Sequence, residues 1–164
     1  MGGSTDVTGG SKVNRFLQVC DIFNIPVVML ADEPGFLVGL ESEKQGIERA
    51  GARLMSTICL SKMPIFTVVI SKVYGVAGQC SHRPTGMFKR ICWPSSNWGS
   101  MHISGGVTAA YKSEIEKASD PEAKKIEIET RLKNITSPFR TAETTGQNII
   151  AVSYTHLRAH ETSP

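Results

Sequence analysis

Two apolar segments that each run directly into a glycine turn constrain the fold of this chain more than any other feature. The first spans residues 30–39 with a turn at 32–36, and the second spans residues 65–78 with a turn at 74–78. Short continuous apolar runs of this kind are typical of buried parallel strands. Open α/β sheets bind their ligands at the carboxyl ends of such strands. We therefore expect the functional site at these two turns.

Helical patterns alternate with these strands along the first half of the chain. We expect a helix that begins at Ser11, a strand over residues 27–31, a helix capped by Ser42, and a strand over residues 65–71. A short strand over residues 88–93 is an open possibility. Strands that alternate with helices indicate an α/β fold with parallel strands and flanking helices.

Two further helices are expected in the second half of the chain. One covers residues 102–117, and the other begins at Asp120-Pro121 and ends near Ile135. Aspartate is a favoured N-cap, and proline is favoured at the first helical position. The second of these helices carries many charges, which indicates a surface helix with Ala123, Ile126 and Leu132 on its buried side.

Size and composition indicate one intracellular domain. The chain has 164 residues, 40% of them hydrophobic, and a net charge of +3. The basic residues are dispersed, which argues against nucleic acid as a partner. No apolar run reaches the roughly 18 residues that span a membrane. The four cysteines are far apart in sequence, which favours the reducing cytoplasm, or the mitochondrial matrix in a eukaryote.

Side-chain catalysis has weak candidates in this sequence. A metal site or a thiol nucleophile at Cys80-Ser81-His82 is disfavoured against an ordinary loop, because no second ligand pair accompanies it, and we predict no metal site. Asp32 and Glu33 form a possible acid–base pair. The proline and glycine that follow favour a turn instead, with Asp32 accepting backbone N–H bonds.

The second glycine turn suits catalysis by the backbone. Gly75 and Gly78 do not have the spacing of a dinucleotide-binding loop. A helix that begins at this turn would direct the N–H groups of Val76 and Ala77 toward a developing oxyanion. From these residues alone, a tight strand-to-helix connection without a ligand remains a serious alternative.

Taken together, these segments resemble the carboxyltransferase (beta) subunit of biotin-dependent acyl-CoA carboxylases, of the propionyl-, methylcrotonyl- or acetyl-CoA carboxylase type. The matching segments are residues 2–7, 15–26, 32–39, 51–54, 72–75, 93–94, 98–101, 105–107 and 137–143. The resemblance implies an incomplete ClpP/crotonase-like domain, the second of the two in the subunit. Residues 1–151 would form part of this C-terminal, biotin-side domain. Residues 152–164 resemble translated adaptor sequence, and we expect a non-native or disordered tail.

The resemblance also implies a mechanism and partners. A carboxyl group would pass from carboxybiotin to the α-carbon of an acyl-CoA substrate, between two oxyanion holes made of backbone amides. Val76 and Ala77 would form the hole for the ureido oxygen of biotin. The surrounding biotin-binding residues would be Gly35, Phe36, Tyr74, Gly75 and Gly78.

In that family, biotin is carried on a partner subunit or domain that also includes biotin carboxylase, and the full-length subunit is a homo-oligomer. The chain alone is then expected to be inactive. Three alternatives remain open: a subunit of a biotin-dependent acyl-CoA decarboxylase, a non-enzymatic assembly fragment that docks through exposed Trp93 and Trp98, and a thiol enzyme based on Cys80.

Overall fold

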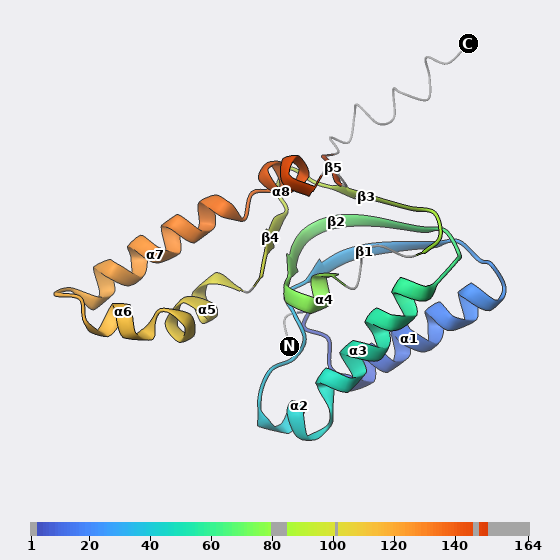
Figure 1. The fold of residues 1–164 in the computed structure, drawn as a ribbon, viewed down its shortest axis with the longest axis horizontal. Coiled ribbons are helices and arrows are strands. Elements are labelled where there is room, and N and C mark those ends of the chain that lie inside the picture. The colour runs from blue at the N-terminus through green and yellow to red at the C-terminus, as the bar shows by residue number, and fades with distance from the viewer. Residues whose placement is uncertain (1–2, 80–84, 101, 146–147, 151–164) are drawn as a thin grey trace, which may run out of the picture.

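The computed structural model describes residues 3–79, 85–100, 102–145 and 148–150 (Figure 1). The Cys80-Ser81-His82 candidate and the expected tail at 152–164 lie outside these residues. The elements are α1 (Val7–Ile22), β1 (Val27–Glu33), α2 (Leu40–Lys44), α3 (Ile47–Leu60), β2 (Ile65–Tyr74), α4 (Gly75–Gln79), β3 (Phe88–Cys92), β4 (Asn97–Gly99), α5 (Ile103–Ala110), α6 (Lys112–Glu116), α7 (Pro121–Ile135), α8 (Pro138–Thr145) and β5 (Asn148–Ile150).

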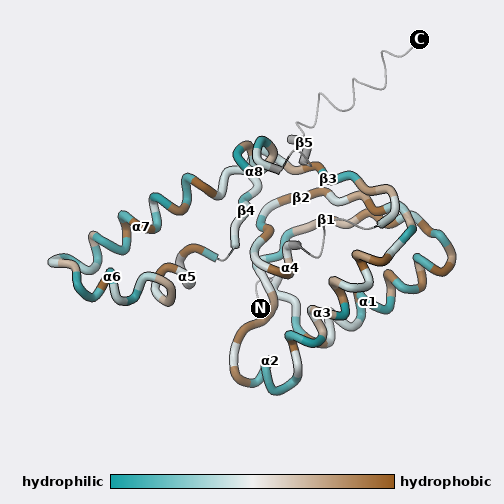
Figure 2. Tube along the Cα trace, in the orientation of Figure 1, coloured by the Kyte–Doolittle hydropathy of each residue, from teal (hydrophilic) through white to brown (hydrophobic). Residues whose placement is uncertain are grey.

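A parallel sheet forms the centre of the fold. The strands lie in the order β1-β2-β3-β5, and β4 pairs with the last residues of β2. Every described pairing is parallel, which confirms the predicted α/β class with parallel strands. Helices α5, α6 and α7 form an arm that extends away from the sheet (Figure 1). Figure 2 shows that α6 and α7 are mainly hydrophilic.

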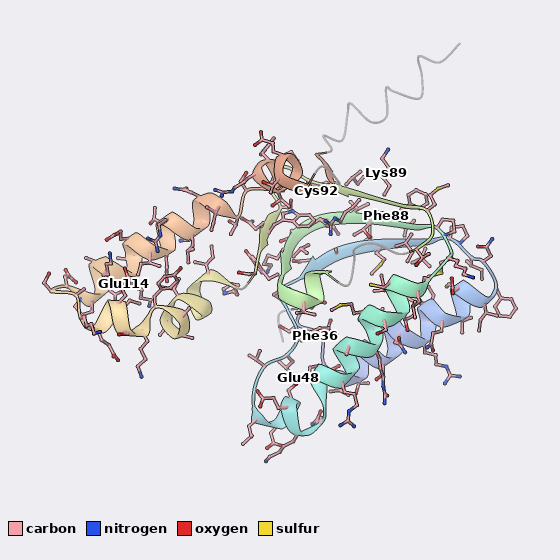
Figure 3. All side chains as sticks on the ribbon, viewed as in Figure 1. Phe36, Glu48, Phe88, Lys89, Cys92 and Glu114 are labelled. Atoms are coloured by element: carbon pink, nitrogen blue, oxygen red, sulfur yellow. The ribbon has the colours of Figure 1, made fainter. Side chains whose placement is uncertain are left out.

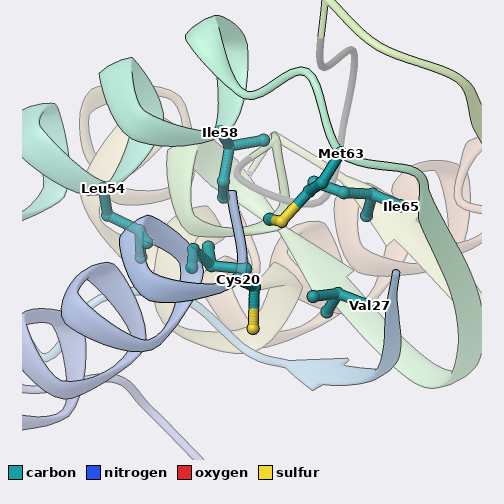
Figure 4. Close-up of a cluster of buried hydrophobic side chains, with 7 residues drawn as sticks. Cys20, Val27, Leu54, Ile58, Met63 and Ile65 are labelled. Atoms are coloured by element: carbon teal, nitrogen blue, oxygen red, sulfur yellow. The ribbon is translucent and has the colours of Figure 1, made fainter. Parts of the chain in front are cut away.

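The main core lies between the sheet and the helix pair α1 and α3. It contains side chains from both helices, from the first residues of β1 and β2, and from the loop before β2 (Figure 4). These residues are Leu17, Cys20, Val27, Leu54, Ile58, Met63 and Ile65. Burial of large apolar side chains at this layer stabilises the position of β2, whose carboxyl end forms the candidate site.

Several helix boundaries differ from the sequence prediction. Helix α1 begins four residues before Ser11, because the Asp6 carboxylate accepts the Gly9 N–H at 2.6 Å and caps it there. The helix expected from Ser42 is two helices, separated at Gly46, whose φ of +85° interrupts the helical backbone. The helix expected over residues 102–117 is likewise two, α5 and α6, which meet at Tyr111.

Helix α7 begins where the sequence predicts. The Asp120 carboxylate accepts the backbone N–H groups of Glu122 and Ala123 at 3.1 and 3.0 Å. The residue that this helix buries is Ile128; of the three expected there, Leu132 is half-buried, whereas Ala123 and Ile126 are exposed. No helix in the described part of the chain is both long enough and apolar enough to cross a membrane.

Candidate functional site

The end of β2 leads without a loop into α4. Gly75 makes this connection with a φ of +62°, a left-handed conformation that favours glycine. A Cβ atom at Gly75 would lie 3.3 Å from the carbonyl oxygen of Ser100. The first amides of a helix have no acceptor within the helix. The first amides of α4, those of Val76 and Ala77 among them, thus have no acceptor within the helix at the carboxyl end of β2.

Two cavities meet at this turn. A cavity of about 210 Å³ lies beside Ala77 and Gly78 and is also lined by Glu33 and Phe36. A larger cavity of about 770 Å³ opens between the turn and the helical arm. Its lining residues are Val73, Gly75, Val76, Trp98, Gly99, Ser100, Ile103, Tyr111, Leu132, Ile135, Thr136 and Thr141. The larger cavity has the volume of a typical small-molecule site.

The structure divides the predicted site residues between these cavities. Phe36, Ala77 and Gly78 line the small cavity, whereas Gly75 and Val76 line the large one. Phe36 packs against α3 (Figure 3), where a Cβ added at Gly51 would lie 2.8 Å from its ring. The Phe36 ring therefore leaves no room for a side chain at Gly51.

The two other predicted site residues support the turns. The Gly35 N–H donates to the Glu33 carboxylate at 3.2 Å. Tyr74 is buried, with its ring edge-on to that of His102 at a centroid distance of 5.8 Å. Burial raises the pKa of the Tyr74 hydroxyl above its usual value, so this group stays protonated at neutral pH.

The carboxylates of Asp32 and Glu33 are engaged by separate parts of the chain. Asp32 Oδ1 accepts the Lys72 N–H at 3.1 Å, so the predicted bond to a backbone N–H exists but comes from β2 rather than the turn. Glu33 accepts the Thr5 hydroxyl at 2.5 Å and the Gly35 N–H. These contacts assign both acids a structural role in the described conformation.

A buried polar cluster behind the large cavity was not predicted. The Arg90 guanidinium lies 4.4 Å from the ring centroid of Trp98, and Trp98 Nε1 donates to Ser96 Oγ at 3.2 Å. Burial lowers the pKa of Arg90 to about 10, and it raises the pKa of the neighbouring Cys92 thiol. The basic pair at residues 89–90 was a signal for this cluster, because adjacent strand residues point to opposite faces.

The hypothesis that the chain docks through exposed Trp93 and Trp98 is therefore wrong for Trp98. Trp98 is 6% exposed, because it packs with Val69, Val73 and Cys92 in a second core cluster. Trp93 is half-exposed. Within the residues that the structure describes, no group of three or more His, Cys, Asp or Glu side chains could hold a metal ion.

Parallel strands, flanking helices and a glycine turn that leads from β2 into α4 agree with the crotonase-like fold that the sequence resemblance implied. Residues 1–159 match the carboxyl transferase domain, and the chain belongs to this family. The chain is 34% identical over 143 residues to the carboxyltransferase subunit of propionyl-CoA carboxylase from Haloferax mediterranei, covering 86% of this chain and 28% of that protein.

Two further similarities extend this result. The alpha subunit of methylmalonyl-CoA decarboxylase from Propionigenium modestum is 32% identical over 145 residues, covering 87% of this chain and 28% of that one. The crystal structure of transcarboxylase 12S, a hexamer with methylmalonyl-CoA bound, superimposes with a TM-score of 0.80 at 31% identity, covering 96% of this chain and 31% of that one. The chain thus spans less than a third of the length of each of these relatives.

Proposed function

We propose that this chain is the biotin-side part of an acyl-CoA carboxyltransferase, in which the N–H groups of Val76 and Ala77 bind the ureido oxygen of biotin. One observation carries this proposal. The left-handed Gly75 presents the first turn of α4 at the mouth of a cavity large enough for a cofactor. In an α/β fold, this edge of the sheet is the usual position of a ligand.

The large cavity fits the fused rings of biotin, which are uncharged. Each residue that lines it, among those described, is apolar or neutral. Trp98, Tyr111 and Leu132 supply apolar walls, and Ser100 and Thr136 supply hydroxyl groups. Sites for small molecules commonly combine apolar walls with a few polar groups that fix orientation.

Backbone donors at this position explain how the chain acts without a titrating side chain. Bound carboxybiotin would supply the carboxyl group and, after its release, a basic ureido nitrogen. The N–H groups of Val76 and Ala77 stabilise the negative charge that develops on the ureido oxygen. The apolar walls lower the local dielectric and strengthen these hydrogen bonds. Fixed donors of this kind require no reorganisation during the reaction.

A decarboxylase subunit is the second candidate function. This chain is 32% identical to the alpha subunit of methylmalonyl-CoA decarboxylase and 34% identical to the carboxyltransferase subunit of propionyl-CoA carboxylase. The two similarities therefore favour the two functions almost equally. The same donors serve both, because charge develops on the ureido oxygen whichever way the carboxyl group moves. A gene for a membrane-embedded sodium-pumping subunit beside this one would favour the decarboxylase.

The proposed partners are an acyl-CoA, a biotin carrier with its biotin carboxylase, and further copies of the subunit. Helix α1 supports an assembled state, because Phe16 and Ile22 on this helix and Phe23 at its C-cap are exposed. Exposed apolar groups of this size mark interaction surfaces. Cys20 and Cys92 are free and buried, which supports a reducing compartment, the cytoplasm or the mitochondrial matrix.

The purified chain is expected to transfer no carboxyl group by itself. The proposal assigns only the biotin-side donors to this chain, so the enolate of the acyl-CoA has no oxyanion hole here. The measurement is incubation of the chain with radiolabelled carboxybiotin and acetyl-CoA or propionyl-CoA, followed by analysis of labelled acyl-CoA. Labelled product above the protein-free rate would contradict the proposed division of the site.

A further inference from the structure

Strand β2 changes partners before it reaches the candidate site. Its first half pairs with β3, and its last residues, 72–74, pair with β4. At the same point the register with β1 shifts, from Ala31 opposite Val69 to Glu33 opposite Val73. Asp32 therefore stands opposite the bulged residues 70–72. A bulge of this kind interrupts the ladder and redirects the strand.

The side chain of Asp32 supplies an acceptor at this bulge. Its Oδ1 atom accepts the backbone N–H of Lys72 at 3.1 Å. The next residue, Val73, pairs with Glu33 on one side and with Trp98 of β4 on the other. The bond from Asp32 thus holds the strand immediately before the segment that leads into α4.

Contacts continue from the bulge to the proposed donors. A Cβ atom added at Gly78 would lie 2.5 Å from Cγ1 of Val73, so α4 packs directly on this residue. Val73 also borders both cavities. A displacement of Val73 therefore cannot leave the first turn of α4 in place, because closely packed interiors transmit strain.

We propose that Asp32 is a positioning residue that sets the direction of the Val76 and Ala77 N–H groups through Lys72 and Val73. The inference rests on the proposed function of these two amides. It assigns Asp32 the part of a hydrogen-bond acceptor, with no proton transfer. The neighbouring Glu33 has a different part, since it ties Thr5, which precedes α1, to the turn after β1.

The test compares Asp32→Ala, which removes the acceptor, with Asp32→Asn, which keeps an amide oxygen at the same position. Asp21→Ala is the matched control. Asp21 accepts the N–H groups of Lys62 and Met63 at 2.7 and 3.0 Å, so it braces the opposite end of β2 in the same way. All three variants and the parent chain are labelled with ¹⁵N and titrated with biotin methyl ester.

In Asp32→Ala, we expect the Lys72 amide to exchange with solvent on the order of tenfold faster, as for loss of a hydrogen bond to a charged group. The Val76 and Ala77 amide resonances should shift. Binding of biotin methyl ester should weaken by about tenfold, because the free energy of the lost Lys72 hydrogen bond then no longer supports the binding conformation. Asp32→Asn should restore both amide resonances and binding. Asp21→Ala should lower stability without moving either resonance.

Two results would overturn the inference. In one, Asp32→Ala leaves the Val76 and Ala77 resonances in place, or Asp21→Ala moves them equally. In the other, Asp32→Asn behaves as Asp32→Ala does, which is the result expected of an acid–base group. If the parent chain itself shows no response to biotin methyl ester, the proposed function fails, and the resonances of the unliganded variants still decide the role of Asp32.

Discussion

Gly78→Ala is expected to destabilise the chain by roughly 3 kcal/mol, the upper end of the usual cost of overpacking. The new Cβ would lie 2.5 Å from Cγ1 of Val73 and 3.0 Å from its carbonyl carbon. Val73 is buried and paired on both sides, so it cannot move away without disturbing β1 and β4. The measurement is the midpoint and slope of urea-induced unfolding.

Gly10→Ala is the matched control for this substitution. Gly10 is also a buried helical glycine, but a Cβ there would meet only Thr5 and Ala50, at 3.7 and 3.9 Å. These are ordinary contacts, and alanine is favoured over glycine in a helix by about 1 kcal/mol. The control should therefore be neutral or stabilising. Equal losses of stability in the two variants would show that the contact with Val73 is not the cause.

Gly86→Ala is expected to have the largest effect on stability, on the order of 4 kcal/mol, which few single substitutions exceed. A Cβ atom there would lie 2.1 Å from the carbonyl oxygen of Lys62 and 2.5 Å from its carbonyl carbon. Both backbones are held in place. The Gly86 N–H donates to the Ser61 carbonyl at 3.0 Å, and Asp21 holds the Lys62 N–H. Thermal unfolding followed by circular dichroism measures the loss.

The double variant Asp21→Ala/Gly86→Ala tests the cause of this effect. Removal of the Asp21 brace lets the Lys62 backbone move away from the new Cβ. The combined loss should therefore be smaller than the sum of the two single losses, as expected for residues that share a contact. Additive losses, or a Gly86→Ala variant with the parent midpoint, would contradict the steric explanation.

Strands β1 and β2 could be predicted from the sequence because each is an apolar run ended by a turn, whereas β4 and β5, of three residues each, are too short to give such a signal. The cap of α7 was also predicted, since Asp120-Pro121 is a local signal that no distant contact opposes. The cap of α1 was not, because Asp6 and Ser11 are both suitable caps and the sequence does not rank them. Trp98 was expected on the surface, and only its tertiary packing against Arg90 and β2 shows that it is buried.

The candidate site was predictable to the extent that it is local. The turn at Gly75 and the amides after it follow from adjacent residues, and the resemblance to the carboxyltransferase family was confirmed by the comparison with known proteins. The large cavity was not predictable, because its walls come from α5, α7 and α8, far along the chain. The partner of Asp32 lies 40 residues away, so no local rule could identify Lys72.

Binding of the ureido oxygen by backbone N–H groups of α4 is the central feature of the proposed site. Val76→Pro removes one of these donors in the first turn of α4, and the Cα chemical shift of Gly75 is recorded as well, because proline restricts the residue before it and Gly75 must keep its left-handed conformation. Val76→Ala keeps the donor, and the Val76 side chain is 54% exposed, so its loss costs little. Both variants and the parent chain would be titrated with biotin methyl ester and followed by ¹⁵N NMR.

In the parent chain and in Val76→Ala, we expect the largest shifts at the amides of residues 76 and 77. Val76→Pro should bind on the order of tenfold more weakly, the upper end of what is expected for loss of one hydrogen bond to a neutral carbonyl oxygen. If Val76→Pro binds as tightly as Val76→Ala, or if the parent shifts map to another part of the chain, the backbone oxyanion hole is not at this turn.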